Sequence, residues 1–255
     1  MRGKQSVKPA SPARPPFDPR EETQLEEDRE WLEWQASFHE TYDEENYAPS
    51  LQSRVMNAGH AFLEKTLGAA LERPRILEVG TGTGAHLPFV APGYGSYLMT
   101  DLNPAVLEVA KGKAERLGVA GVSTAVASAL SLPYEAGSVD RLIAAHVLEH
   151  LPEPHRALKE WRRVVRPGGV VSILIPTDPG FAWRMGRHFG PRRQALARGV
   201  PYDYVMAREH VNACVNLLAL IRHYYAERSE HWWPFRLPSV DLNLFVAIHA
   251  RAPER

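Results

Sequence analysis

The chain has a single cysteine, no excess of charge of either sign and no long apolar run. One cysteine in 255 residues excludes a disulfide framework and a structural zinc site made of several thiolates, and it is typical of a reducing compartment. Thirty basic residues balance thirty acidic ones, so the chain has no overall field that would attract nucleic acid. We therefore expect a protein without a metal site and without a nucleic-acid partner.

Segments that direct a chain into or across a membrane are also missing. The longest apolar run, residues 169–176, is far too short to span a bilayer. No N-terminal stretch has the apolar core of a signal peptide. These absences predict a cytoplasmic protein, and its length is sufficient for one well-buried core.

Composition divides the chain into three parts. Residues 1–20 contain five prolines, five Lys or Arg residues and one acid, a composition that cannot pack a core and predicts a flexible tail. Residues 21–50 have seven acids in their first thirteen positions, and their spaced apolar residues predict a helical cap. Residues 51–255 form the main domain, which begins with a helix at about residues 55–70.

Strand and helix patterns alternate along the main domain. The expected parallel strands are residues 75–79, 96–100, 121–126, 141–145 and 170–175. One helix is expected directly after Gly84, and two others should cover residues 104–117 and 154–165. Gly168-Gly169 would stop the last of these helices. Two terminal strands, near residues 227–233 and 242–249, have no helix between them and should pair antiparallel. The pattern predicts an α/β fold, with a doubly wound, Rossmann-like sheet of seven strands that is mostly parallel and ends in an antiparallel hairpin.

An insertion at residues 181–206 interrupts this alternation. It is rich in arginine and aromatic residues, and no acid occurs from Pro179 to Tyr202. We interpret it as a lid that recognises an anionic or partly apolar molecule, which it could also reach by peripheral contact with a membrane; a solvated charged face is the alternative. Its candidate contacts are Arg184, Arg187 and His188, followed by His210 and Asn212. The next helix is expected to bury Val211, Cys214, Val215, Leu218 and Ile221 on one face.

The most informative stretch is a glycine loop after the first strand. Gly80, Gly82 and Gly84 satisfy G-x-G-x-x-(G/A), which by itself is a weak sign of dinucleotide binding. Glu78 changes that interpretation, because a carboxylate beside the loop favours an ammonium or sulfonium ligand and repels a pyrophosphate. S-adenosylmethionine carries both cationic groups and no phosphate, so we predict it as the cofactor.

Further candidates follow the later strands. Asp101 ends the second strand, roughly 20 residues after the loop, where an acid can accept hydrogen bonds from ribose hydroxyls. The alternative is that Asp101 caps the helix that begins at Pro104. After the third strand, the small residues at Ser128-Ala129 leave a slot beside Leu130, which can stack on an adenine face.

Taken in order, these motifs resemble the class I S-adenosylmethionine-dependent methyltransferases, and most of all the type 11 small-molecule subgroup that includes quinone-biosynthesis enzymes. The likeness covers residues 75–176. The cofactor contacts that it implies are Glu78, Gly80, Thr81, Gly82 and Gly84 at the methionine end, Asp101 at the ribose, Leu102, Ser128, Ala129 and Leu130 around the adenine, and His146 under the methionine moiety. Many relatives carry an acid where this chain has Ser128, which implies a weaker hydrogen bond to the adenine amino group.

The expected reaction is methyl transfer to a small, anionic or lipophilic acceptor. The sulfonium methyl is already activated, so the main task of the protein is to orient the acceptor, which can lower the barrier by about 7–11 kcal/mol. A general base contributes less, a rate increase of about 10²–10⁴-fold. The candidate catalytic residues are His146, His150 and Tyr47; the alternative for His150 is that it caps or packs the turn at residues 148–152, and the alternative for Tyr47 is plain packing. The alternatives are an RNA or protein methyltransferase, a non-catalytic methyltransferase-like binding module, and a nicotinamide oxidoreductase. The sequence predicts neither the acceptor's identity nor the oligomeric state.

Overall fold

The computed structural model describes residues 51–68, 71–90 and 93–254. The predicted tail (residues 1–20) and helical cap (residues 21–50), together with the candidate catalytic residue Tyr47, lie outside the described residues.

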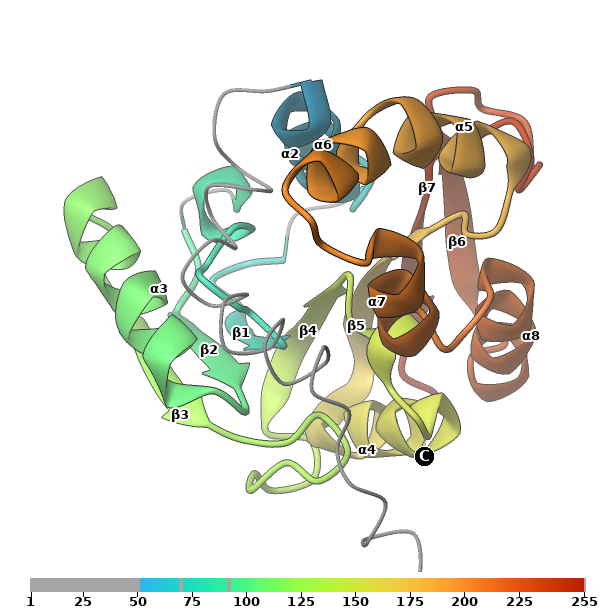
Figure 1. The fold of residues 1–255 in the computed structure, drawn as a ribbon. Coiled ribbons are helices and arrows are strands. Elements are labelled where there is room, and N and C mark those ends of the chain that lie inside the picture. The colour runs from blue at the N-terminus through green and yellow to red at the C-terminus, as the bar shows by residue number, and fades with distance from the viewer. Residues whose placement is uncertain (1–50, 69–70, 91–92, 255) are drawn as a thin grey trace, which may run out of the picture.

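A seven-stranded sheet forms the centre of the molecule, in the order β3-β2-β1-β4-β5-β7-β6 (Figure 1). Its strands are β1 (Arg75–Val79), β2 (Ser96–Asp101), β3 (Val122–Val126), β4 (Val139–Ala145), β5 (Val165–Pro176), β6 (Arg228–Trp233) and β7 (Phe245–Arg251). The first five strands pair in parallel, whereas β7 runs antiparallel to both β5 and β6. The predicted fold class is confirmed.

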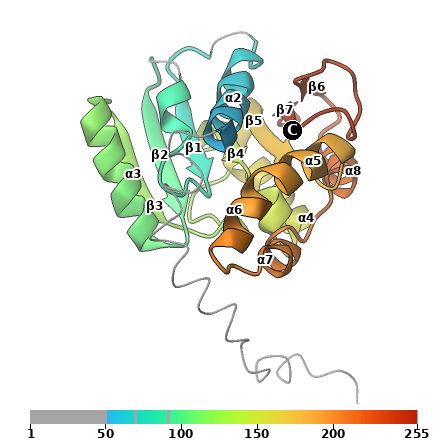
Figure 2. The same cartoon turned by 45° about the horizontal axis from the view of Figure 1, so that its top comes forward.

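Helices cover both faces of the sheet. They are α2 (Leu51–Lys65), α3 (Pro104–Leu117), α4 (Pro154–Val164), α5 (Phe181–Phe189), α6 (Pro191–Ala197), α7 (Tyr202–Glu209) and α8 (Cys214–Tyr224). On one face Leu63 of α2 and Ala110 of α3 share a buried cluster with Tyr97 of β2; on the other, Trp161 of α4 and Ile221 of α8 pack together. Helices α5, α6 and α7 follow one another after β5 and group together on one side of the molecule (Figures 1 and 2). Within the described ranges, none of the helices has the length and apolarity needed to cross a membrane.

Helix α3 shows how local sequence sets an element's bounds. Asn103 caps its N-terminus, Pro104 occupies the first turn, and Gly118 ends it in the left-handed conformation with a φ of 64°. Each of these residues satisfies or removes a backbone group that the helix end would leave unpaired. The predicted bounds, residues 104–117, are therefore correct.

Two predicted helix boundaries are wrong. The helix expected after Gly84 is missing: among the described residues between Gly84 and β2, the structure forms a 3₁₀ turn, η2 (Leu87–Phe89), and no α-helix. Pro88 lies in that turn and Pro92 follows soon after it, and proline blocks helix propagation because it lacks an N–H. Helix α4 ends at Val164 and passes directly into β5, so that Gly168-Gly169 lie inside a strand rather than after a helix, close to where the pairing with β4 shifts register.

The end of the insertion also differs from the prediction. Helix α7 runs to Glu209, and α8 begins only at Cys214, because the linker between them is held by other bonds. The N–H of Asn212 donates to the carbonyl of Glu149 at 3.1 Å, and that of Cys214 donates to the carbonyl of Asp178 at 2.8 Å. The predicted apolar face is therefore wrong in part. Val211 and Val215 are exposed, while α8 buries Cys214, Leu217, Leu218 and Ile221.

Candidate functional site

Two loops meet outside the carboxyl ends of β1 and β4. The strand order reverses its direction between these neighbours, which is where ligands bind in open α/β sheets. Gly80 follows β1 with a φ of 62°, and a Cβ on it would lie 2.7 Å from a Cγ of Val147, which comes after β4. Glycine is required here by the backbone conformation and by the close approach of the two loops. The sequence pattern thus marks a tight junction at the switch point of the sheet.

Asp101, at the end of β2, holds the glycine loop in place. Its Oδ2 accepts a hydrogen bond from the N–H of Gly82 at 3.0 Å, and its Oδ1 accepts one from the N–H of Asn103 at 3.0 Å. The alternative role as a helix cap is wrong for Asp101, because the Asn103 side chain caps α3 by accepting from the N–H of Ala105 at 2.9 Å. Each carboxylate oxygen keeps a further lone pair, so Asp101 retains acceptors for ribose hydroxyls, and that role stays a prediction.

Glu78 lies beneath the loop. Its side chain is buried, and one carboxylate oxygen accepts a hydrogen bond from the phenol of Tyr97 at 2.6 Å. Burial raises the pKa of Glu78, although the charge of His86 and the hydrogen bond from Tyr97 oppose the change. The predicted contact of Glu78 with the ammonium group of a donor stays a prediction.

The residues predicted to surround an adenine lie on two adjacent loops. Leu102 is 68% exposed directly after Asp101, although a large apolar side chain usually seeks burial. The N–H of Ala127 donates to the carbonyl of Asp101 at 3.0 Å, which ties the loop after β3 to the end of β2. In that loop the hydroxyl of Ser128 accepts from the N–H of Leu130 at 3.2 Å. The structure thus brings this group together beside Asp101, and its contact with adenine stays a prediction.

His146 follows β4 in a strained conformation. Its φ is 58°, in the left-handed region that a residue other than glycine rarely adopts. Its N–H donates to the carbonyl of Leu174 at 2.9 Å, and its Nδ1 lies 3.3 Å from Oε1 of Glu149. Its Nε2 is buried and has no hydrogen-bond partner among the described residues. Strain of this kind, beside an unpaired buried nitrogen, is typical of functional sites.

Glu149 lies at the centre of this polar group. It sits in a 3₁₀ turn, η3 (Leu148–His150), where its side chain is buried and its Oε2 finds no partner in the described part of the chain. Burial opposes ionisation of Glu149, but the hydrogen bond from His146 and the nearby histidines outweigh it and lower the pKa. The side chain of His150 is 35% exposed, and its Nδ1 lies 3.1 Å from Oε2 of Glu209. Burial opposes protonation of His150, but the contact with Glu209 outweighs it and raises the pKa. The arrangement favours a carboxylate that orients His146.

Asp178, just after β5, gathers the inner side chains of the insertion. Its Oδ2 lies 2.8 Å from Nδ1 of His210 and accepts from a guanidinium N–H of Arg187 at 2.9 Å. Burial opposes ionisation of Asp178, but His210 and Arg187 outweigh it and lower its pKa. The ring of His210 stacks on Trp183, with centroids 6.4 Å apart, and meets the edge of His150 at 5.0 Å. Of the predicted acceptor contacts, the structure therefore brings His210 to His150 after β4, and Asp178 holds Arg187 beside His210.

The other predicted acceptor contacts have different positions. Asn212 donates its side-chain amide to the carbonyls of Leu148 and Leu151, at 2.9 and 2.6 Å, and so fixes the η3 turn. Arg184 and His188 lie exposed on α5. Contact of these three residues with an acceptor stays a prediction.

Sequence reasoning missed Asp178 and a buried polar network behind the site. Asp178 follows the fifth strand, so the argument that selected Asp101 would also have found it. No sequence signal marks the network, because its members come from distant elements. In it, Nδ1 of His60 lies 3.0 Å from Nδ1 of His86, whose Nε2 lies 2.9 Å from Glu64. The ring of His60 meets that of His146 at 5.7 Å.

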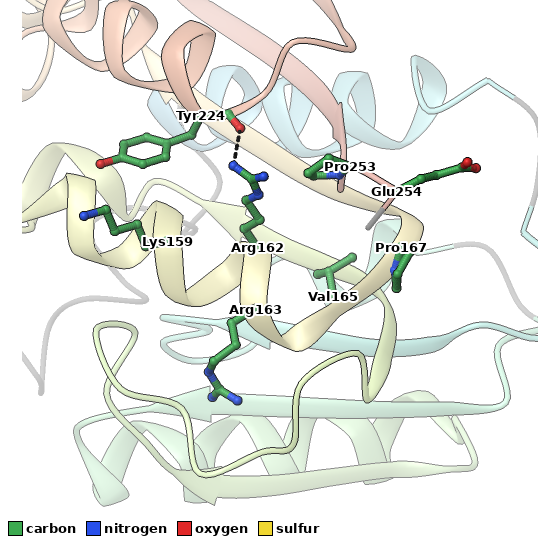
Figure 3. Close-up of a pocket in the computed structure, with 8 residues that line it drawn as sticks. All are labelled: Lys159, Arg162, Arg163, Val165, Pro167, Tyr224, Pro253 and Glu254. Carbon is green, nitrogen blue, oxygen red and sulfur yellow. Dashed lines mark hydrogen bonds between the residues drawn. The ribbon is translucent and has the colours of Figure 1, made fainter.

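A separate cavity lies at the amino end of β5, away from the carboxyl ends of the parallel strands (Figure 3). It is lined by Lys159, Arg162, Arg163, Val165, Pro167, Tyr224, Pro253 and Glu254. A guanidinium N–H of Arg162 donates across it to the carbonyl of Tyr224, at 3.5 Å. This cavity holds none of the predicted site residues.

Comparison with known proteins identifies the class. Residues 77–173 match the family described as "Methyltransferase domain". The ubiquinone/menaquinone biosynthesis C-methyltransferase UbiE of Acidiphilium cryptum is 38% identical over 125 residues, which cover 47% of this chain and 50% of that protein. The 2-methyl-6-phytyl-1,4-hydroquinone methyltransferase 2 of rice is 32% identical over 136 residues, covering 50% of this chain and 38% of that protein. The chain thus spans about half the length, or less, of these relatives.

Solved structures agree on the fold. The PH0226 protein of Pyrococcus horikoshii superposes with a TM-score of 0.59 at 15% identity, over 84% of this chain and 98% of that one. The YcgJ protein of Bacillus subtilis gives a TM-score of 0.54 at 16% identity, over 78% and 99%. Residues 77–173 therefore form a methyltransferase domain, as the sequence predicted, and the solved structures support its fold. This family uses S-adenosylmethionine as its methyl donor, as predicted, and its relatives include quinone-biosynthesis enzymes.

Proposed function

We propose that this chain transfers a methyl group from S-adenosylmethionine to a small, partly apolar acceptor with a hydroquinone-like ring. The observation that carries the proposal is the junction at the switch point, where the glycine loop held by Asp101 meets the loop of His146. The printed activities of the quinone and hydroquinone relatives support the class of acceptor. The proposed donor contacts remain those predicted from the sequence, from Glu78 to His146.

The donor supplies an activated sulfonium methyl, so the chain has to orient the acceptor and receive a proton. Glu149 accepts from Nδ1–H of His146, which leaves the lone pair on Nε2 of His146. That nitrogen is buried and has no partner among the described side chains, so it can take a proton from an acceptor hydroxyl or ring carbon. Trp183 and His210, whose rings stack, are positioned to bound an aromatic acceptor on the side of the insertion.

The test is product formation by the full chain. Methyl-labelled S-adenosylmethionine would be incubated with alkylated benzohydroquinones and naphthohydroquinones, and S-adenosylhomocysteine and the methylated product would be quantified. We expect turnover with at least one ring acceptor. His146→Asn, which keeps a side chain that tolerates positive φ, should lower kcat by about 10²-fold or more.

A matched variant separates proton transfer from structural damage. Glu149→Gln should also lower kcat, and it should add little further loss in the His146→Asn background, because both residues act through Nε2. Donor binding without S-adenosylhomocysteine from any acceptor would favour the non-catalytic module. Turnover unchanged in His146→Asn would remove His146 from the reaction.

A further inference from the structure

The outer face of α5 carries an exposed apolar stripe. Phe181, Met185 and Phe189 recur every four residues and therefore share one face, with exposures of 56%, 39% and 62%. The opposite face points inward, where Trp183 contacts His210 and Arg187 contacts Asp178. No residue of α5 is buried. The helix therefore places these three apolar side chains in solvent and turns Trp183 and Arg187 toward the candidate site.

The loop between β6 and β7 extends this apolar surface. Phe235 and Leu237 are 57% and 61% exposed. Asn243, which is buried, accepts from the N–H of Phe235 and donates to the carbonyl of Leu237, so the loop has a defined shape. The N–H of Phe181 donates to Asp241 of the same loop at 2.9 Å, and the loop lies beside α5 in both views (Figures 1 and 2). The stripe and the loop tip are thus joined at the start of α5.

Positive charge surrounds the apolar side chains. Arg184 lies next to the stripe on α5, Arg193 is exposed on α6, and Arg236 lies between the two apolar residues of the loop. Among the described residues, these three arginines form no ion pair, whereas Arg187 and Arg192 are paired with acids. No acid occurs from Pro179 to Tyr202. Asp241, the acid of the neighbouring loop, accepts from the N-terminus of α5.

We propose that this surface docks on an anionic phospholipid bilayer. We name it the docking surface, and it consists of Phe181, Arg184, Met185, Phe189, Arg193, Phe235, Arg236 and Leu237. Exposed aromatic and aliphatic side chains flanked by arginine match the acyl boundary and the phosphate layer of such a bilayer. Because the other face of α5 borders the candidate site, docking places that site beside the membrane.

The proposal is tested by vesicle flotation of the full chain without donor or acceptor. Vesicles of phosphatidylcholine with about 30% phosphatidylglycerol should carry the protein upward. Binding should weaken by at least about tenfold when phosphatidylglycerol is omitted or when the salt is raised from about 0.05 M to 0.5 M. Arg184→Glu/Arg193→Glu and Met185→Ser/Phe189→Ser should each reduce partitioning by at least about tenfold.

Matched controls lie on α3, on another side of the sheet. Lys111→Glu/Arg116→Glu makes the same change of charge, and Val109→Ser/Leu117→Ser removes two apolar side chains that are 43% and 47% exposed; both should bind like the unmodified chain. Absence of binding, binding independent of anionic lipid, or equal loss in the controls would overturn the proposal. So would a dimer, seen by light scattering, that Met185→Ser/Phe189→Ser dissociates without any vesicle binding, because it would assign the surface to a second copy. The test uses no reaction, so its failure leaves the proposed methyl transfer untouched.

Discussion

At the scale of single residues, the site uses side chains that have two tasks. Asp101 holds the backbone of Gly82 and is also the predicted acceptor for ribose hydroxyls. His146 keeps a strained backbone because the N–H bond to Leu174 and the contact with Glu149 hold it there. Strain of this size, of order 1–3 kcal/mol, persists only where the surroundings impose it.

Removal of the Asp101 carboxylate tests the donor site. Asp101→Ala should weaken S-adenosylmethionine binding by about tenfold or more, because hydrogen bonds to a charged group contribute about 1.5–3 kcal/mol each. Isothermal titration calorimetry gives the affinity directly. Glu108→Ala, at an exposed position of α3, is the control and should bind as the unmodified chain does. Equal affinities for Asp101→Ala and the control would contradict the ribose role.

At the scale of elements, the site depends on how closely the loops after β1 and β4 approach. That approach needs glycine at position 80, since Val147 occupies the space that a side chain would take. On the other side of the same loop, Gly84 lets α3 pack closely, because a Cβ there would lie 3.2 Å from the Cβ of Ala110. The glycines therefore set the distance between elements as well as the shape of the loop.

Two alanine substitutions separate these contributions. Gly118, the residue that ends α3, has a φ of 64°, close to the 62° of Gly80, but no atom within 4 Å of the position of a Cβ. Gly118→Ala should therefore cost only the backbone strain, about 1–2 kcal/mol. Gly80→Ala should lower the free energy of unfolding by more than Gly118→Ala does. Adding Val147→Ala to Gly80→Ala should restore part of that difference. Urea unfolding of the four chains measures these free energies, and equal losses at both glycines would show that the contact with Val147 does not matter.

At the scale of the whole molecule, a buried polar network links helix α2 with strands β4, β5 and β7. Arg141 of β4 donates to both carboxylate oxygens of Glu64 and to the hydroxyl of Ser172. That hydroxyl contacts Nδ1 of His249 at 3.1 Å, and Nε2 of His249 lies 3.1 Å from the hydroxyl of Thr66. Partners from four elements satisfy these buried groups, which makes the network sensitive to protonation.

Stability should therefore fall in acid. Burial and the charge of Arg141 lower the pKa of His249 from 6.5 to about 4. Because the unfolded chain binds this proton near pH 6.5, stability from neutral His249 is lost as the pH falls from about 7 to 4, by about 3 kcal/mol. Burial opposes ionisation of Glu64, but the hydrogen bonds from His86 and Arg141 outweigh it and lower its pKa from 4.5 to about 2. The stability that ionised Glu64 contributes is therefore lost as the pH falls from about 4.5 to 2.

Urea unfolding at pH 7, 5.5 and 4.5 measures this dependence. His249→Gln, which cannot take up the proton, should flatten it, whereas His155→Gln at an exposed position of α4 should not. A slope unchanged by His249→Gln would show that other groups control the acid sensitivity.

The sequence by itself determined the order of the seven strands along the chain, the glycine loop and the position of Asp101 at the end of a strand. These features depend on periodicity, glycine and proline, which act over a few neighbouring residues. The bounds of α3 were correct for the same reason, since its cap, proline and terminal glycine are local. The prediction failed where two local signals competed, as after Gly84, or where distant bonds delayed a helix, as before Cys214.

Only the tertiary structure decided which candidate residues share a site. His146 and Glu149 lie together after β4, whereas His210 follows α7, and Asp178 joins His210 to Arg187 of the insertion. The structure also assigned Asn212 to the η3 turn and turned Arg184 outward, although both looked like equivalent contacts in the sequence. The physical reason is that hydrogen bonds and burial between distant residues depend on how elements pack, and no pattern of neighbouring residues encodes that packing.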